Sequence, residues 1–274
     1  MPRHVPSDVA AAMARVSPRA GAIGRLLHWL DSTTSTNDVA ARLAESGAEE
    51  GTTVVAETQT AGRGRHGRIW FSPPGAGLYV STIVRPADAM RSNVNPAALL
   101  TIASGVAVAE AVHAVTGLPA HIKWPNDVMI GGRKLAGILA EATLQAGALH
   151  FVVVGVGVNL HSTAYPPELA SRVTSIEAET SRPPDRAVML AEVLASMGER
   201  YGDLRAGRFD AILTAWRRLA ASLPGADVEW ESPAGVVRGR AQDIDRDGAL
   251  LVQVAGKIER VVAGEVRWLS VNTF

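Results

Sequence analysis

Residues 60–72, TAGRGRHGRIWFS, combine backbone freedom, positive charge and one large aromatic ring within a short stretch. Glycines let successive backbone N–H groups point into one concavity, and arginines around it donate paired hydrogen bonds to an anion. The alternating residues are Gly62, Arg63, Gly64, Arg65, Gly67 and Arg68. The stretch therefore predicts a loop that binds an anion.

The segments on either side of this loop have the pattern of strands. TTVVAET at 52–58 is rich in β-branched residues, and GLYVSTIV at 77–84 has the same character. Because no helix follows the glycines, the loop is not a dinucleotide fingerprint, and because no Lys-Ser or Lys-Thr pair is present, it is not a nucleotide-hydrolase phosphate loop. Two alternatives stay open: a solvated glycine-arginine hairpin and a nucleic-acid-binding arm.

Composition limits these alternatives. The 274 residues are 47% hydrophobic, which suits one large domain or one large and one small domain. Lys plus Arg number 27 and Asp plus Glu number 27, so the net charge is zero and any anion site must be local. With 5% aromatic residues, this balance disfavours a nucleic-acid module. The absence of cysteine excludes disulfides, a thiol nucleophile and Cys-bound zinc, and it fits a reducing cytosol.

The ends and the longest apolar segment favour a chain outside the membrane. Residues 1–24 lack the apolar core of a signal peptide, so we expect a loose leader with a short helix. Residues 96–115 approach the length of a membrane span, but Glu110 and His113 interrupt them. We therefore interpret this segment as a buried core helix.

The rest of the pattern predicts an α+β fold. TSTNDVAARLAESG at 34–47 has capping hydroxyls and helical spacing. Residues 121–159 alternate as strands and glycine turns, which indicates an antiparallel meander covered by helices at 96–116 and 185–204. A helix at 209–221 precedes a Pro-Gly break, after which short, closely spaced strands predict a small β-barrel. We expect a leader at 1–24, a catalytic domain at 25–223 and the barrel at 224–274.

Three further stretches carry groups suited to binding. KWPND at 123–127 places a cation, an amide and a carboxylate where one strand turns into the next. GGRKLAGIL at 131–139 presents Lys134, which taken alone could be a surface lysine. VVVGVGVN at 152–159 puts glycines and Asn159 on one strand face, as a bare patch for a ligand or for close helix packing.

The ordered set of these motifs resembles the biotin protein ligases. TSTN, ETQTAGRGRHGRIWFSP, KWPND, RKLAGIL and GVGVN occur in this order and are followed by the short strands, over roughly residues 31–269. The resemblance implies a central mixed, largely antiparallel sheet flanked by helices, a fold shared with lipoate ligases, and a C-terminal β-barrel. It implies formation of biotinyl-5′-AMP from biotin and ATP with Mg²⁺, and then transfer to a lysine of the biotin carboxyl carrier domain of an acyl-CoA or pyruvate carboxylase.

The resemblance also assigns roles to residues. Lys134 and Arg65 would hold the biotin carboxylate and the α-phosphate, Asp127 would position or deprotonate the acceptor lysine, and Trp70 would stack near adenine. The implied biotin-binding set is Ser35, Thr36, Asn37, Gln59, Gly62, Arg63, Gly64, Arg65, Lys134, Gly137, Gly155 and Gly157. The implied ATP-binding set is Arg63, Arg65, Arg68, Trp70, Lys123, Asn126, Asn159 and Glu265. No metal ligand is assigned.

The remaining expectations concern partners. TSTN begins 34 − 1 = 33 residues after Met1, which leaves no room for the helix-turn-helix domain of repressor members, so we expect no specific DNA binding. We expect a cytoplasmic monomer or homodimer. An arginine of the family's barrel is replaced by Leu269, with Arg267 close by, and His66 is interpreted as an ordinary loop histidine. The alternative enzyme is a lipoate or octanoyl ligase, which is disfavoured because a lipoyl chain has no ureido group.

Overall fold

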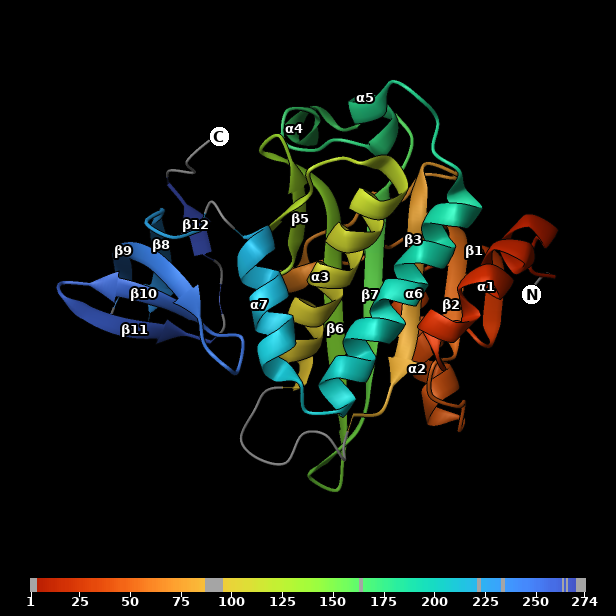
Figure 1. The fold of residues 1–274 in the computed structure, drawn as a ribbon, viewed down its shortest axis with the longest axis horizontal. Coiled ribbons are helices and arrows are strands. Elements are labelled where there is room, and N and C mark those ends of the chain that lie inside the picture. The colour runs from red at the N-terminus through yellow and green to blue at the C-terminus, as the bar shows by residue number, and fades with distance from the viewer. Residues whose placement is uncertain are drawn as a thin grey trace.

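The chain folds as a seven-stranded sheet covered by helices, with a second, smaller sheet beside it (Figure 1). The computed structural model describes residues 4–86, 96–162, 165–220, 223–232, 235–262, 264 and 266–269. The predicted α+β class is confirmed, with the helices on the faces of an antiparallel-rich sheet.

The large sheet is mixed, and its strand order is β1-β2-β3-β7-β6-β5-β4. Its first two strands pair in parallel and every other neighbouring pair is antiparallel. The predicted meander is present as four consecutive strands that pair in sequence order. The strands are β1 Leu27–Thr33, β2 Thr53–Gln59, β3 Gly77–Val84, β4 His121–Lys123, β5 Asp127–Ile130, β6 Arg133–Gln145 and β7 Ala148–Asn159.

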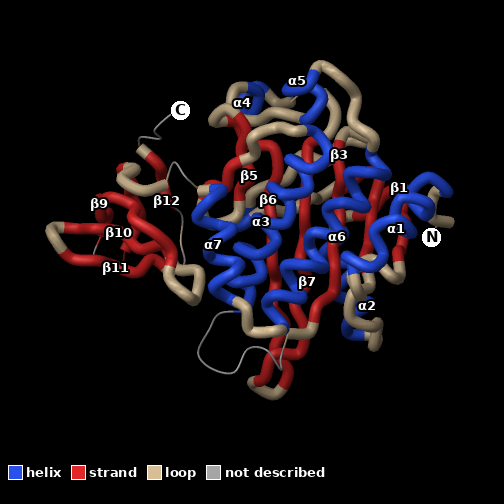
Figure 2. Tube along the Cα trace, in the orientation of Figure 1, coloured by secondary structure: helices blue, strands red, loops and turns tan. Residues whose placement is uncertain are grey.

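Helices cover both faces of this sheet (Figure 2). Helices α3 (Pro96–Thr116), α6 (Arg186–Arg205) and α7 (Phe209–Leu219) enclose the main core on one face. Helix α2 (Thr36–Glu45) packs on the other face over a separate apolar cluster that includes Phe151. Short helices α4 (Pro167–Ala170) and α5 (Ile176–Thr180) follow β7. The alternation along each strand therefore supplies side chains to two cores.

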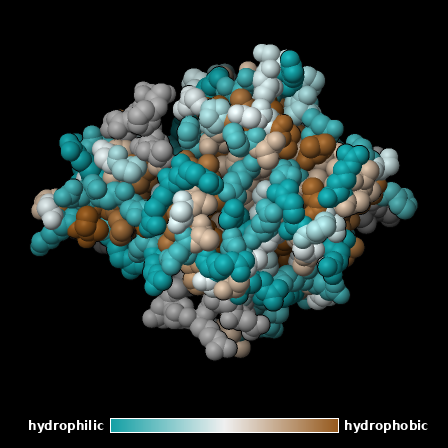
Figure 3. All heavy atoms as spheres, in the orientation of Figure 1, coloured by the Kyte–Doolittle hydropathy of each residue, from teal (hydrophilic) through white to brown (hydrophobic). Residues whose placement is uncertain are grey.

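Helix α3 is long and apolar enough to cross a membrane, but most of it is enclosed by protein. Of its most apolar window, 67% is buried, between the sheet and the two neighbouring helices. This placement agrees with the predicted buried core helix. The surface of the molecule on the face shown in Figure 3 is mainly hydrophilic.

The expected short helix is present as α1 (Ser7–Ala20), but the expectation that the leader is loose is wrong, because this helix is docked on α6. Val9 and Ala12 are buried in the main core, and Ala20 at the end of the helix is also buried. A Cβ at Gly198 of α6 would lie 2.3 Å from the backbone oxygen of Ala20, so only glycine permits this approach. Arg19 also hydrogen-bonds two glutamates of α6. The close contact between Ala20 and Gly198 depends on small residues, and hydropathy alone does not identify such a contact.

The expected C-terminal barrel is an open antiparallel sheet of order β11-β10-β9-β8-β12. Among the described residues β11 pairs with β10 and β12 pairs with β8, and no pairing joins β11 to β12. The indole nitrogen of Trp124 donates to the Gly248 oxygen at 2.9 Å and so fastens this sheet to the large one. The strands are β8 Asp227–Ser232, β9 Gly235–Ile244, β10 Leu250–Val254, β11 Lys257–Val261 and β12 Val266–Trp268.

Candidate active site

A cavity of about 720 Å³ collects nearly all the residues that the sequence selects. Its walls come from the start of α2, the loop between β2 and β3, strands β5 to β7, the segment after α4, and β12. Gly62 does not line it, and Glu265 lies outside the described residues. All the other predicted site residues line this single cavity.

The glycine-arginine loop folds as a small hairpin over the cavity. The Trp70 N–H donates to the Gly62 oxygen at 2.8 Å, and the Gly64 N–H donates to the Arg68 oxygen at 2.7 Å. A Cβ at Gly62 would lie 2.6 Å from the Trp70 oxygen, so glycine is required there to close the hairpin. Gly62 therefore shapes the loop instead of facing the cavity. At the tip, His66 has a left-handed φ of 56°.

Buried polar groups at the start of α2 form one hydrogen-bonded network. The Gln59 side-chain oxygen accepts from the Thr36 N–H at 2.8 Å and from its hydroxyl at 3.1 Å. The Ser81 hydroxyl lies 2.7 Å from the Thr36 hydroxyl and 2.6 Å from the Asn37 side-chain oxygen. Because one hydroxyl donates a single proton, it satisfies one acceptor at a time. Such a network suits a ligand that carries both donors and acceptors.

Two members of this network were missed by sequence reasoning. Ser81 lies on the buried β3, and Ser72 accepts from the Gln59 side-chain nitrogen at 3.0 Å. Ser81 sits in a strand that is buried throughout, which offered a signal, since a buried hydroxyl needs a partner. Ser35 is 3% exposed and completes the set as the residue that precedes α2.

The glycine patch of β7 is covered by the indole of Trp70. A Cβ at Gly157 would lie 2.4 Å from Trp70 Cε2, and a Cβ at Gly137 would lie 3.0 Å from Trp70 Cζ3. Gly155 lies instead beneath the side-chain amide of Asn37. A Cβ at Gly155 would lie 2.3 Å from Asn37 Oδ1. The resemblance implied that biotin binds at this patch and that Trp70 stacks near adenine. In this conformation the Trp70 indole itself occupies the strand surface at Gly137 and Gly157.

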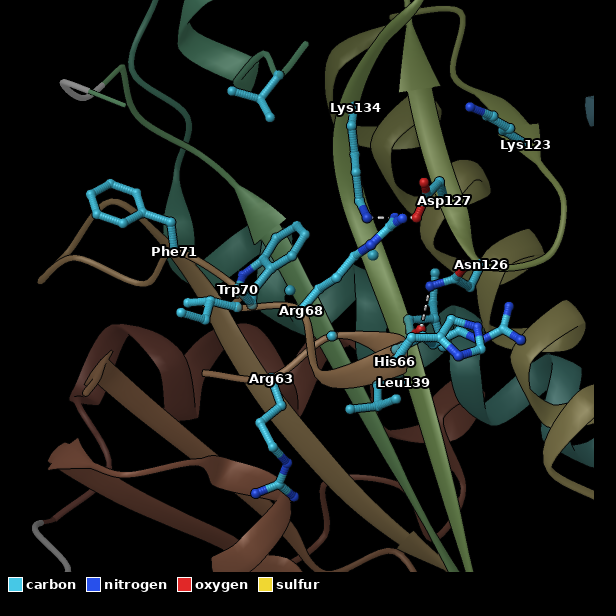
Figure 4. A pocket seen from close by; sticks show the side chains of 18 of the residues that line it. Arg63, His66, Arg68, Trp70, Phe71, Lys123, Asn126, Asp127, Lys134 and Leu139 are labelled. Atoms are coloured by element: carbon cyan, nitrogen blue, oxygen red, sulfur yellow. Dashed lines mark hydrogen bonds and ion pairs between the residues drawn. The ribbon is translucent and has the colours of Figure 1, made fainter. Parts of the chain in front are cut away.

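Cations surround one carboxylate in the opposite part of the cavity. Lys134 Nζ lies 2.6 Å from Asp127 Oδ1, and Figure 4 shows Arg68 extending toward this pair. Burial lowers the pKa of Arg65, and Asp127 nearby opposes that change. Burial likewise lowers the pKa of Lys123, although Asp127 opposes the shift. Positive charge exceeds negative charge here, so the region can take more than one anionic group.

Lys134 also contacts the aromatic wall. Its ammonium lies 5.2 Å from the Trp70 ring centroid, within the range of a cation–π interaction. The same residue is fixed at its backbone, because its N–H donates to the Arg172 oxygen at 2.9 Å. Lys134 and Arg65 thus share one cavity, as the sequence interpretation requires.

Arg63 points away from the other cations (Figure 4). Its guanidinium lies 2.6 Å from Asp38 Oδ1 and 3.3 Å from Glu141 Oε2. Two carboxylates on α2 and β6 therefore hold the side chain of Arg63, which also lines the cavity. Neither carboxylate was selected from the sequence.

The amides assigned to the nucleotide side support the backbone near the cavity. The side-chain nitrogen of Asn126 donates to the Ile138 oxygen at 2.9 Å, and that of Asn159 donates to the Thr174 oxygen at 2.9 Å. These bonds leave each amide oxygen as the remaining acceptor. Both residues line the cavity while anchoring its walls.

Residues outside the recognised motifs also line the cavity. Arg172 follows α4, and its charge acts on Lys123. Arg267 and Trp268 of β12 face the cavity from the smaller sheet, although Arg267 also lies 3.6 Å from Glu229. Arg172 belongs to an irregular segment with no pattern to mark it. Among the described residues, no group of three or more His, Cys, Asp or Glu could hold a metal ion.

Two family models match the chain in the order in which its two sheets occur. The biotin/lipoate A/B protein ligase family matches residues 29–159, and the biotin protein ligase C-terminal domain matches residues 225–267. The first range begins within β1 and ends with β7, and the second begins before β8 and ends within β12. All of the matched motif residues named above fall within these ranges.

Relatives and solved structures agree with the two models. A biotin--[acetyl-CoA-carboxylase] ligase of Mycobacterium tuberculosis is 38% identical over 90% of each chain. One from Paracoccus denitrificans is 33% identical over 86% of this chain and 98% of the relative. The biotin protein ligase of Aquifex aeolicus, in complex with biotin and ATP, superposes with a TM-score of 0.76 at 29% identity, covering 89% of this chain and 98% of that one. With this similarity and the cavity described above, the chain belongs to the biotin protein ligase family.

Proposed function

We propose that this protein is an ATP-dependent biotin protein ligase. It would form biotinyl-5′-AMP and transfer biotin to a lysine of the biotin carboxyl carrier domain of a carboxylase, such as acyl-CoA or pyruvate carboxylase. One observation carries the proposal: Lys134 and Arg65 both line the cavity that also holds the buried polar network at the start of α2. A head group and a reacting carboxylate can therefore be bound in one place.

The biotin head group would bind at the start of α2. Its ureido ring offers N–H donors and a carbonyl acceptor, which match the mixed groups of Ser35, Thr36, Asn37 and Gln59. An unmatched polar group buried there would cost about 1–3 kcal/mol. The thioether ring would lie over Gly155 and Gly157, so the Trp70 indole has to turn away from Gly157 while the hairpin stays over the cavity.

In the first step, a biotin carboxylate oxygen would attack the α-phosphorus of ATP, and pyrophosphate would leave. Two anions must approach, so Lys134 and Arg65 would offset their repulsion and stabilise the charge at phosphorus. Mg²⁺ would enter on the ATP phosphates as part of the substrate. The hairpin with Gly62 and Gly64 at its base would cover the adenylate and exclude water.

The nucleotide would occupy the cation-rich part of the cavity. Lys123 and Arg68 would contact phosphate, while Asn126 and Asn159 would offer amide oxygens. Trp70, once moved from the glycine surface, would border adenine, and Glu265 would contact ATP.

In the second step, the acceptor lysine amine would attack the acyl carbon of biotinyl-5′-AMP, and AMP would leave. Asp127 would orient this amine or take its proton. Because Asp127 is paired with Lys134 at 2.6 Å, it becomes available only when Lys134 turns to the substrate. The turn of Lys134 from Asp127 to the substrate would thus make both side chains available for the reaction.

The cellular setting is part of the proposal. We propose a cytoplasmic enzyme, without a membrane partner, that acts as a monomer or homodimer. The net charge of zero gives no general attraction to DNA, so we expect no specific retardation of its own promoter in a gel shift.

Intact-mass spectrometry of a carrier domain tests the proposal. The domain is incubated with this protein and ATP, and with either biotin or lipoate. We expect the mass of one biotinyl group to be added in the biotin arm alone, and Lys134→Ala to abolish it. Addition of lipoate instead, or no modification in either arm, would contradict the proposal.

A further inference from the structure

The hairpin between β2 and β3 is tied to the body of the protein by three charged side chains. Arg63 at its base lies 2.6 Å from Asp38 Oδ1, on α2, and 3.3 Å from Glu141 Oε2, on β6. The three side chains come from separate elements that converge only through the fold. This set is named here the loop tether.

The loop tether continues into the polar network at the start of α2. Glu141 Oε2 accepts a hydrogen bond of 2.5 Å from the side-chain nitrogen of Asn37. A carboxylate only accepts, so this bond directs the Asn37 oxygen toward the Ser81 hydroxyl, 2.6 Å away. That oxygen is also the group that lies over Gly155. One carboxylate therefore holds both the hairpin and an amide of the cavity.

We propose that Asp38 and Glu141 are positioning residues that couple closure of the hairpin to the orientation of Asn37. The inference rests on the proposed function, because it treats Asn37 as a biotin contact and the hairpin as the cover over the adenylate. Asp38 and Glu141 do not line the cavity. They act through Arg63 and Asn37, and a change at either one alters how long the hairpin stays closed.

The exposure of these groups sets the size of the effect. The side chains of Arg63, Asp38 and Glu141 are 40%, 33% and 43% exposed, so solvent screens each pair. Partly exposed pairs shift an equilibrium by at most about fivefold each. We expect opening of the hairpin to rise about threefold when one carboxylate is neutralised, and about tenfold when both are.

Two substitutions at Glu141 separate its two contacts. Glu141→Gln removes the charge opposite Arg63 but keeps an oxygen that can accept from Asn37. Glu141→Ala removes both, leaving the Asn37 nitrogen with the Leu139 oxygen at 3.5 Å. Asp38→Asn is the second test of the charge, and Glu45→Gln is its matched control, since Glu45 is an exposed carboxylate at the far end of the same helix.

The first measurement needs no biotin. Trypsin cleaves after arginine, so the cleavage rate within residues 63–68 of the full chain reports opening of the hairpin. We expect it to rise about threefold in Asp38→Asn and Glu141→Gln and to stay unchanged in Glu45→Gln. Unchanged cleavage in both test variants would overturn the proposal, whether or not the protein ligates biotin.

The second measurement separates the two contacts by function. Escape of biotinyl-5′-AMP is followed after a single turnover, and biotin affinity is measured by calorimetry. We expect Glu141→Gln to speed escape about threefold with near-normal biotin affinity, and Glu141→Ala to lose affinity as well. Equal biotin affinity in all variants would refute the coupling to Asn37. Absence of biotinyl-5′-AMP in the unaltered protein would refute the proposed function, while the trypsin result would still decide the loop tether.

Discussion

Lys134→Ala isolates the cation that the proposed chemistry needs most. Lys134 Nζ lies 2.6 Å from Asp127 and 5.2 Å from the Trp70 ring centroid, and the side chain is 27% exposed. Removing one preorganised donor to a developing negative charge costs about 100- to 1,000-fold in rate. We expect a loss of this size in biotinyl-5′-AMP formation.

The loss of stability should be much smaller. The ion pair with Asp127 contributes at most about 1 kcal/mol, after its partial exposure is considered. The contact with Trp70 contributes about 0.5–1 kcal/mol. The melting temperature should therefore fall by only a few degrees, and the variant should stay folded under assay conditions.

Quenched-flow measurement of biotinyl-5′-AMP separates chemistry from folding. Arg133→Ala is the matched control, because Arg133 precedes Lys134 on β6 but pairs with Glu179 and does not line the cavity. We expect Arg133→Ala to form the adenylate within about threefold of the normal rate. Adenylate formation in Lys134→Ala at the rate of this control would refute the role assigned to Lys134.

Three further changes probe other parts of the structure. Gly157→Ala would place a Cβ 2.4 Å from the Trp70 indole, so we expect altered tryptophan emission and about tenfold weaker biotin binding by calorimetry; unchanged emission would contradict the packing. The lowered pKa of Lys123 means that its positive charge is lost at lower pH than in a free lysine, so KM for ATP should rise with pH, and Lys123→Arg should flatten this profile. Gly198→Ala, at 2.3 Å from the Ala20 oxygen, should destabilise the fold by about 1–3 kcal/mol in a thermal melt without changing the rate of the folded enzyme; an unchanged melt would contradict docking of α1.

Local patterns predicted the elements that depend on short-range pairing. The meander from β4 to β7 follows from alternating strands and two-residue turns, and its neighbours in sequence are neighbours in the sheet. The cavity residues were selected through the resemblance to the biotin protein ligases, whose motifs lie in and beside the strands of the large sheet. Periodicity gave no comparable signal for α1, whose docking depends on a close approach to Gly198.

Contacts between distant elements could not be predicted in the same way. Arg63 was selected as one of several loop arginines, and only the fold brings Asp38 and Glu141 to it. Trp70 was expected beside a base, but the bare surface at Gly157 accommodates its ring. Spacing of short strands likewise does not reveal whether the last strand closes a barrel, and among the described residues no pairing joins β11 to β12.

The central claim is that Lys134 and Arg65 join the biotin carboxylate to the α-phosphate within one cavity. Exchange of labelled pyrophosphate into ATP measures this reversible step directly, without a carrier domain. We expect exchange that requires biotin, is not supported by lipoate, and falls by about 100-fold or more in Lys134→Ala and Arg65→Ala. Exchange that proceeds without biotin, or that survives both substitutions, would contradict the claim.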